Sequence, residues 1–239
     1  MNTGNFFRLC LFLMLLMISG VSHAGIQVGG TRVIFPASDH EASLQVRNEG
    51  TDDIMIQSWI EAGSEQADRD IPFAITPSLA RLSHRKQQTL RIFYQGKGLP
   101  EDRESVFWVS VQEIPQVSSS ENSLQVAFRQ RLKLFYRPNG LPGKPEESAN
   151  TLKWNILRNA GKAVLLATND SAFHVSFAKV IVIAGDKEYV VEPEMISPRD
   201  AQKMSIKGLP ASVGGDAQIV WESINDYGAL IEHKVSIKF

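Results

Sequence analysis

The residues best suited to chemistry in this sequence are cations that stand among apolar neighbours. The segment 27–36 reads as the first strand, and Arg32 is its only charged residue. The segment 124–137 alternates between two parities, and one parity carries four cations: Arg129, Arg131, Lys133 and Arg137. Two interpretations fit this pattern. It is either a hairpin strand with a solvated basic face, or a long edge strand that offers backbone donors, apolar side chains and cations to a partner.

Catalytic and metal-binding patterns are absent from the sequence. It contains no Gly-x-Ser-x-Gly elbow, no phosphate-binding GxxxxGK[ST] and no GxGxxG. The histidines beyond residue 24 are far apart in the chain: His40, His84, His174 and His233. Such spacing does not supply the ligand pairs of a zinc site. Paired catalytic carboxylates remain open from sequence, but a solvated surface explains the scattered acidic residues more simply. We expect no enzymatic activity, no metal and no cofactor.

Net charge and the N-terminal residues narrow the class of protein further. The chain has 25 basic and 26 acidic residues, and its formal net charge of −1 argues against a charge-driven nucleic-acid binder. Residues 1–24 contain one basic residue, Arg8, followed by the apolar run LCLFLMLLMI and a small-x-small end at Ala24. This pattern predicts a cleaved secretory signal peptide, because the run is shorter than the roughly 20 residues of a membrane-spanning helix. The mature chain is then exported without membrane insertion, and it lacks cysteine because the single Cys10 is removed.

Period-two alternation of apolar and polar residues dominates the mature sequence. It is clear in the segments 42–47, 54–57, 90–94, 124–129 and 231–239. Turn residues separate these segments, and no amphipathic helix is longer than a turn or two, which is typical of β-sandwiches. The stretch 137–145 has the Pro- and Gly-rich composition of a linker. We therefore predict an all-β chain with two immunoglobulin-like β-sandwich domains, over residues 25–143 and 144–239.

Six motifs, in this order along the chain, resemble those of a known family. They are DRESVFW at 102–108, EIP at 113–115, LQVAF at 124–128, KLFYRP at 133–138, MISPR at 195–199 and INDYG at 224–228. In combination they are similar, over the whole mature chain, to the periplasmic pilus-assembly chaperones of the chaperone–usher pathway. The resemblance implies two immunoglobulin-like domains set at an angle, with a cleft between them. It also implies pilus or fimbrial subunits and an outer-membrane usher as partners, and leaves open whether the free chain self-associates.

The resemblance implies roles for eight residues. Arg32 and Lys133 match two cations that bind the C-terminal carboxylate of a subunit deep in the cleft. Leu124, Val126 and Phe128 match alternating apolar residues that complete the open sandwich of the subunit by donor-strand complementation. Glu104, Arg137 and Asp226 match an interdomain salt-bridge network that holds the two domains in their relative pose.

Two questions stay open from sequence. Strict alternation places Lys133 on the parity opposite to Val126, and a bulge, a twist or an inward bend would each reconcile their roles. The polar loop 116–123 is short and there is no cysteine in the mature chain, so the sequence resembles the short-loop branch of the family, which serves rod-like pili.

The alternative function is a two-domain immunoglobulin-like adhesion or binding module. A pilus subunit or a periplasmic hydrolase fits less well.

Overall fold

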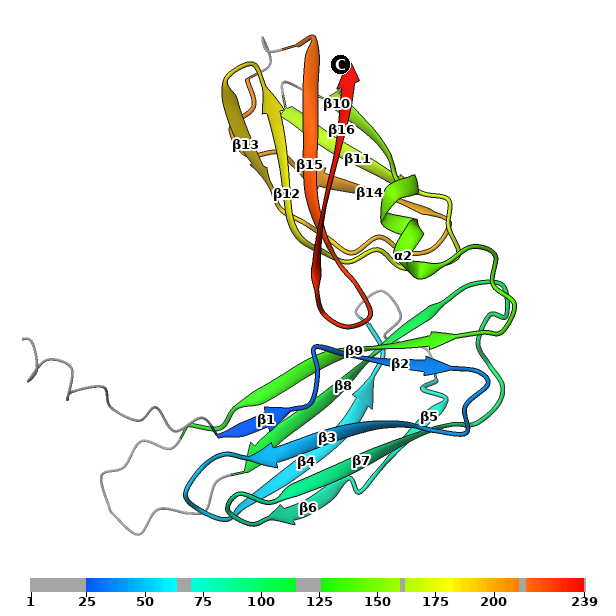
Figure 1. The fold of residues 1–239 in the computed structure, drawn as a ribbon, viewed down its shortest axis with the longest axis vertical. Helices are drawn as coiled ribbons and strands as arrows, with labels where there is room; N and C mark the ends of the chain where they lie inside the picture. The colour runs from blue at the N-terminus through cyan, green and yellow to red at the C-terminus, as the bar shows by residue number, and fades with distance from the viewer. Residues whose placement is uncertain (1–24, 64–69, 115–125, 160–161, 211–213, 239) are drawn as a thin grey trace, which may run out of the picture.

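The computed structural model describes residues 25–63, 70–114, 126–159, 162–210 and 214–238. Their regular structure is almost all strand, arranged in two β-sandwiches that follow one another along the long axis of the molecule (Figure 1). The expected signal peptide 1–24, the expected loop 116–123 and Leu124 lie outside the described residues. The predicted all-β architecture with two sandwiches is confirmed.

The first sandwich packs a four-stranded sheet against a five-stranded sheet. The four-stranded sheet has the order β1 (Ile26–Val28), β3 (Ala42–Asn48), β7 (Gln87–Tyr94) and β5 (Phe73–Thr76). The five-stranded sheet has the order β2 (Arg32–Pro36), β9 (Arg129–Arg137), β8 (Ser105–Ile114), β4 (Ile54–Glu61) and β6 (Leu79–Leu82). Residues of β3 alternate strictly between buried and exposed, and those of β4 bury every second side chain, as the sequence pattern predicts. The apolar faces enclose one core, in which Phe35, Leu90 and Phe107 are almost fully buried.

The second sandwich has its own core. Its smaller sheet has the order β10 (Lys153–Asn159), β11 (Lys162–Asn169) and β14 (Asp200–Ser205), and its larger sheet has the order β13 (Lys187–Val191), β12 (Phe177–Ala184), β15 (Asp216–Ile224) and β16 (Leu230–Lys238). A short helix, α2 (Pro145–Ser148), and a 3-10 turn (Ala149–Thr151) precede β10. Leu165, Val182 and Ile219 lie at the centre of this core.

The first strand predicted from sequence is divided in the structure. Residues 27–36 read as one strand, but the chain turns at Gly29 and Gly30, and β1 and β2 belong to opposite sheets. Gly30 has a φ of 154°, which favours glycine, and its N–H donates to the carbonyl of Val28. The switch carries Arg32 out of the β1 ladder and to the side of β9.

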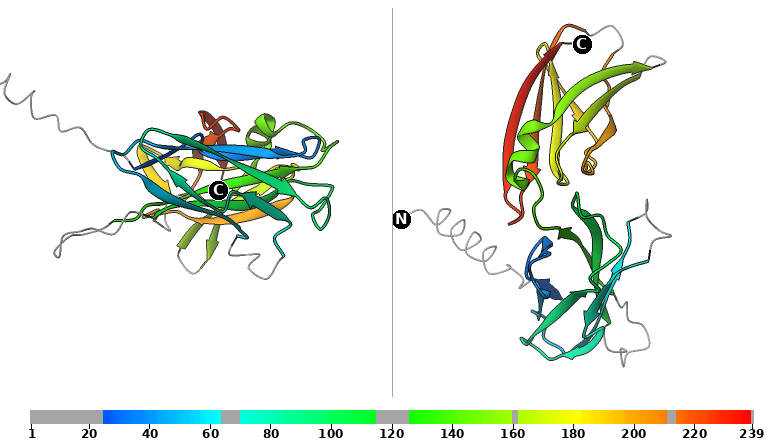
Figure 2. Two further views of the ribbon diagram at one scale, coloured as in Figure 1. Left: turned by 90° about the horizontal axis from the view of Figure 1, so that it is seen from below. Right: turned by 90° about the vertical axis from the view of Figure 1, so that its right-hand side faces the viewer.

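The two sandwiches are inclined to one another, and their facing ends approach closely (Figure 2). The turn between β15 and β16 points toward β2 and β9 of the first sandwich (Figure 1). This arrangement forms an interdomain cleft whose lining comes from both sandwiches. In the part of the chain that the structure describes, no helix is long and apolar enough to cross a membrane.

Candidate functional site

Arg32 and Lys133 lie side by side where the first sandwich faces the second, although they are about a hundred residues apart in sequence. They are register partners in the parallel ladder between β2 and β9. Both reach the second sandwich. The Nη1 group of Arg32 donates to the carbonyl oxygen of Ile224 at 2.9 Å, and the Nζ group of Lys133 donates to Oγ of Ser176 at 2.9 Å. The fold thus brings together the two cations that the sequence singled out.

The surroundings of this cation pair disfavour positive charge. Burial, and then the neighbouring Arg32, lower the pKa of Lys133 to about 8. Burial also lowers the pKa of Arg32, against the opposing attraction of Asp226 and Glu104. Neither cation has an ion-pair partner within 4.0 Å among the described residues, and Nε of Arg32 is buried without a hydrogen-bond partner there. Two partly desolvated cations with donors to spare form a site suited to an anionic group.

Two cavities adjoin the cation pair. The smaller, of about 40 Å³, is lined by Arg32, Phe135, Arg137 and residues of the second sandwich. The larger, of about 350 Å³, lies on the second sandwich and includes Ser176, the partner of Lys133. Lys133 lines neither cavity, and Arg32 lines only the smaller one. The open space therefore lies beside Arg32 and on the second sandwich, next to the hydroxyl that Lys133 contacts.

Glu104, Arg137 and Asp226 form a continuous ion-pair network across the domain boundary. Nη2 of Arg137 lies 2.8 Å from Oε1 of Glu104, and its Nη1 lies 2.8 Å from Oδ2 of Asp226. Glu104 is only 3% exposed. Its Oε2 accepts hydrogen bonds from both the backbone N–H and Nδ1 of His174, each at 2.8 Å. The carboxylates on either side of Arg137 raise its pKa against the effect of burial.

The segment before β9 differs from its expected form. The sequence pattern predicts one strand of about 14 residues, but β9 begins at Arg129, and the described residues 126–128 are not in a strand. The segment is held next to β8 at one point, where the N–H of Glu113 donates to the carbonyl of Phe128 at 2.9 Å. Val126 and Phe128 are 53% and 58% exposed, which is unusual for large apolar side chains.

The strand β9 is an edge along only part of its length. It lies second in its sheet, because β2 covers it from Lys133 to Arg137. Before Lys133, the side of β9 that faces away from β8 has no neighbouring strand in the described residues. The exposed edge predicted from sequence is therefore the half of β9 next to Val126 and Phe128. Such an edge presents unpaired backbone donors and acceptors.

The opposite parities of Val126 and Lys133 need no bulge within β9. Its pairing with β8 runs without a register shift from Arg129 to Tyr136. Leu132, Leu134 and Tyr136 face the core, whereas Lys133 and Arg137 face the second sandwich. Within β9 the two parities thus face opposite sides: even-numbered residues face the core and odd-numbered ones supply the cations, while Val126 and Phe128 lie before the strand begins.

The remaining two cations of the basic parity have local partners. Arg129 lies over the ring of Trp59 at 4.8 Å, and Arg131 lies over the ring of Trp108 at 4.1 Å. Both form ion pairs with Glu61. Arg129 and Arg131 are thus paired with a carboxylate of the first sandwich, whereas Arg32 and Lys133 have no such partner among the described residues.

Sequence reasoning missed two residues of the site, His174 and Ser176. Ser176 is buried and the side chain of His174 is only 4% exposed; both residues lie in a segment without clear alternation, and each meets a residue of the first sandwich. No local pattern marks them, since their contacts exist only once the two sandwiches are placed together.

Comparison with known proteins assigns the chain to a family. Residues 25–142 match the family described as "Pili and flagellar-assembly chaperone, PapD N-terminal domain", and residues 147–235 match "Pili assembly chaperone PapD, C-terminal domain". The chain belongs to the pilus-assembly chaperone family. The resemblance inferred from the six motifs is confirmed.

Relatives of this pilus chaperone share most of its length. It is 36% identical over 240 residues to the probable fimbrial chaperone YadV of Escherichia coli K12, covering 97% of each chain, and 35% identical to the chaperone FimC of the same strain, covering 92% and 87%. The crystal structure of YadV superposes with a TM-score of 0.80 over 90% of this chain and 100% of that one, at 35% identity. The SafB chaperone of Salmonella enterica, solved in complex with the SafA pilin, superposes with a TM-score of 0.73 over 90% and 96%, at 28% identity.

Proposed function

We propose that this chain is a periplasmic chaperone that binds, folds and caps pilus subunits and delivers them to an outer-membrane usher. It carries no catalysis of its own in this role. The signal peptide 1–24 directs export and is removed. The complex of the related SafB chaperone with a pilin supports pilus subunits as the partner class.

The observation that carries the proposal is the pair Arg32 and Lys133. A subunit whose chain ends in the cleft places its C-terminal carboxylate against these two cations. Each charge-assisted hydrogen bond contributes roughly 1.5–3 kcal/mol. The carboxylate also fixes the register of the subunit along β9, and register matters because a shift of one residue turns every side chain to the wrong face.

The second part of the proposal concerns the donor segment, Leu124, Val126 and Phe128. A pilus subunit is an incomplete sandwich that exposes its core along a groove. The donor segment extends β9 as a strand in that groove, and its apolar side chains fill the open core. Each large side chain that becomes fully buried contributes about 1.5–3 kcal/mol. The exposure of Val126 and Phe128 in the chaperone alone supports this role.

The third part concerns Glu104, Arg137 and Asp226, which we assign to holding the two sandwiches in their relative pose. The ion pairs that join them support this assignment. Because Arg137 follows Lys133 on the same face of β9, a fixed pose keeps the cations aligned with the second sandwich.

Co-purification from the periplasm tests the donor segment. A tagged chaperone is co-expressed with a candidate pilus subunit from the same genome, and the recovered subunit is quantified. We expect Val126→Asp to lower recovery at least tenfold. Val190→Asp is the matched control, because Val190 is equally exposed (56%) on β13 of the second sandwich. Equal recovery with both variants would favour the alternative, a two-domain adhesion or binding module.

A further inference from the structure

Glu113 is a buried carboxylate whose bonding is incomplete. It lies near the end of β8, is 9% exposed, and its Oε2 is buried without a hydrogen-bond partner among the described residues. Burial raises the pKa of Glu113, and a hydrogen bond from the backbone N–H of Ile26 opposes that rise. A buried, half-satisfied carboxylate is costly, and a nearby cation would offset the cost.

The free oxygen of Glu113 lies against the first residue of the expected mature chain. A Cβ built on Gly25 would overlap Oε2 of Glu113, so the carboxylate occupies the space that a side chain would take there. The α-nitrogen of Gly25 is bonded to the same Cα and is therefore close to this carboxylate. In the precursor that nitrogen belongs to the neutral amide between Ala24 and Gly25.

Removal of the signal peptide changes the charge at this nitrogen. The leader-removing peptidase adds water across the Ala24–Gly25 bond: the C–N bond breaks, a carboxylate forms on Ala24, and the α-nitrogen of Gly25 becomes an ammonium group. An ammonium group has three N–H donors in place of one. Cleavage thus produces a cation next to the unpaired oxygen of a buried carboxylate.

We infer that Glu113 binds the α-ammonium group of Gly25 that signal-peptide cleavage creates. The inference rests on the leader removal in the proposed function, and it adds a positioning residue beside the donor segment. The surrounding bonds favour the pair. The carbonyl of Gly25 accepts from the N–H of Glu49 at 3.0 Å, and the carbonyl of Ile26 accepts from Nε2 of Gln130 at 2.8 Å. These two bonds fix the backbone of Gly25 and Ile26 next to Glu113.

The position of Glu113 connects this ion pair with subunit binding. Its backbone N–H donates to the carbonyl of Phe128 at 2.9 Å, and its carboxylate faces Gly25. Glu113 therefore holds the mature N-terminus and the donor segment against each other, at the open half of the β9 edge. In a chain that still carries its leader, the nitrogen of Gly25 is a neutral amide, so Oε2 of Glu113 has no cation beside it there.

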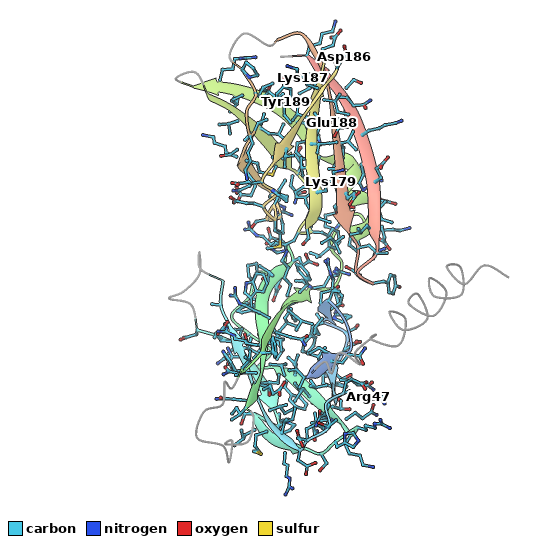
Figure 3. All side chains as sticks on the ribbon, turned by 90° about the vertical axis from the view of Figure 1, so that its left-hand side faces the viewer. Arg47, Lys179, Asp186, Lys187, Glu188 and Tyr189 are labelled. Atoms are coloured by element: carbon cyan, nitrogen blue, oxygen red, sulfur yellow. The ribbon has the colours of Figure 1, made fainter. Side chains whose placement is uncertain are left out.

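The pKa of the α-amino group tests the inference directly. Mature full-length chain, purified from the periplasm, is trace-acetylated over a pH series, and labelling of the N-terminal peptide is followed by mass spectrometry. An unperturbed α-amino group has a pKa of about 7.7–8.0. We expect a rise of at least one unit in the native chain and a return to the usual range in Glu113→Gln. Glu188→Gln is the matched control and should keep the raised value, because Glu188 is exposed on β13 of the second sandwich (Figure 3), whereas Gly25 precedes β1 of the first.

A second variant covers the case in which Glu113→Gln does not fold. A mature chain that retains Ala24 as its first residue moves the ammonium group one residue away from Glu113. We expect this extension to lower the denaturation midpoint of the chain with Glu113 intact. A native α-amino pKa in the usual range, or an intact mass showing that the exported chain does not begin at Gly25, would overturn the inference. Subunit co-purification tests the chaperone function separately, so a failure of the Glu113 inference can be distinguished from a failure of the proposed function.

Discussion

Gly228 in the turn between β15 and β16 packs directly against Thr31, the residue before Arg32. A Cβ built on Gly228 would lie 2.6 Å from Oγ1 of Thr31 and 3.4 Å from its Cγ2. Gly228 also has a φ of 82°, and the turn is fixed by the amide oxygen of Asn225, which accepts from the N–H groups of Tyr227 and Ala229. The second sandwich thus meets the first one residue from a candidate anchor cation.

Gly228→Ala should therefore weaken subunit binding by displacing this turn from Thr31. Gly96→Ala is a matched control: Gly96 also has a φ of 82°, but a Cβ there meets no atom within 4 Å. Both variants carry the same backbone strain of roughly 1–2 kcal/mol, so both should lose similar stability in denaturant unfolding. We expect a tenfold or greater loss of subunit recovery only for Gly228→Ala, and partial rescue when Thr31→Gly is added. Equal recovery for both variants would show that the contact does not matter.

The affinity for a subunit carboxylate should fall as the pH rises from 7 to 9. The pKa of Lys133 is about 8, so most of its charge is lost over this range. A bound carboxylate favours the protonated amine, so the Lys133-dependent part of the affinity should fall about tenfold by pH 9, or about 1.4 kcal/mol. Titration calorimetry with a peptide of the last strand of the subunit measures this, with the C-terminal amide as the control that should bind weakly at both values.

Protein stability should show the opposite trend over part of this range. The pKa of Lys133 is lowered from 10.5 in the unfolded chain to about 8 in the folded one. Between these values the unfolded chain holds more protons, so this group makes the folded state more stable as the pH rises. A loss of affinity caused by Lys133 therefore cannot come from unfolding through the same group. If affinity is unchanged from pH 7 to 9, Lys133 does not contact the carboxylate.

Removal of Glu104 should cost more stability than removal of Asp226. Glu104 is buried and accepts from both Arg137 and His174, whereas Asp226 is partly exposed. Glu104→Ala leaves Arg137 buried with one partner fewer, and we expect the free energy of unfolding to fall by about 3–5 kcal/mol. Asp226→Ala should cost about 1 kcal/mol. Urea unfolding of both variants measures the difference, and equal losses would contradict the assigned network.

The sequence predicted those features that depend on local pattern. Alternation in segments such as 42–47 and 231–239 predicted the strands β3 and β16, and the family resemblance predicted that Arg32 and Lys133 lie together. The cations stand out because charge among apolar residues is rare within a strand, and charges buried in proteins are usually paired.

The features that sequence could not predict depend on contacts between distant segments. Gly29 and Gly30 fit the sequence pattern of one continuous strand. Only the pairing of β1 with β3 and of β2 with β9 shows that the chain changes sheet there. Among the described residues, β9 begins at Arg129 and does not include 126–128: its pairing with β8 ends at Gln112, and beyond it the N–H of Glu113 donates to the carbonyl of Phe128. His174 contacts Glu104, and the carboxylate of Glu113 lies against Gly25. Both contacts join residues that are far apart in sequence.

We propose that Arg32 and Lys133 anchor the C-terminal carboxylate of the subunit. Co-purification with one candidate subunit, comparing Arg32→Ala and Lys133→Ala with two control variants, tests it most directly. Arg47→Ala and Lys187→Ala remove exposed cations of β3 and β13, away from the facing ends of the two sandwiches (Figure 3). We expect native recovery with both controls and at least a tenfold loss with either cleft variant, each still folded by circular dichroism. Recovery that is equal for all four variants would show that Arg32 and Lys133 do not anchor the subunit.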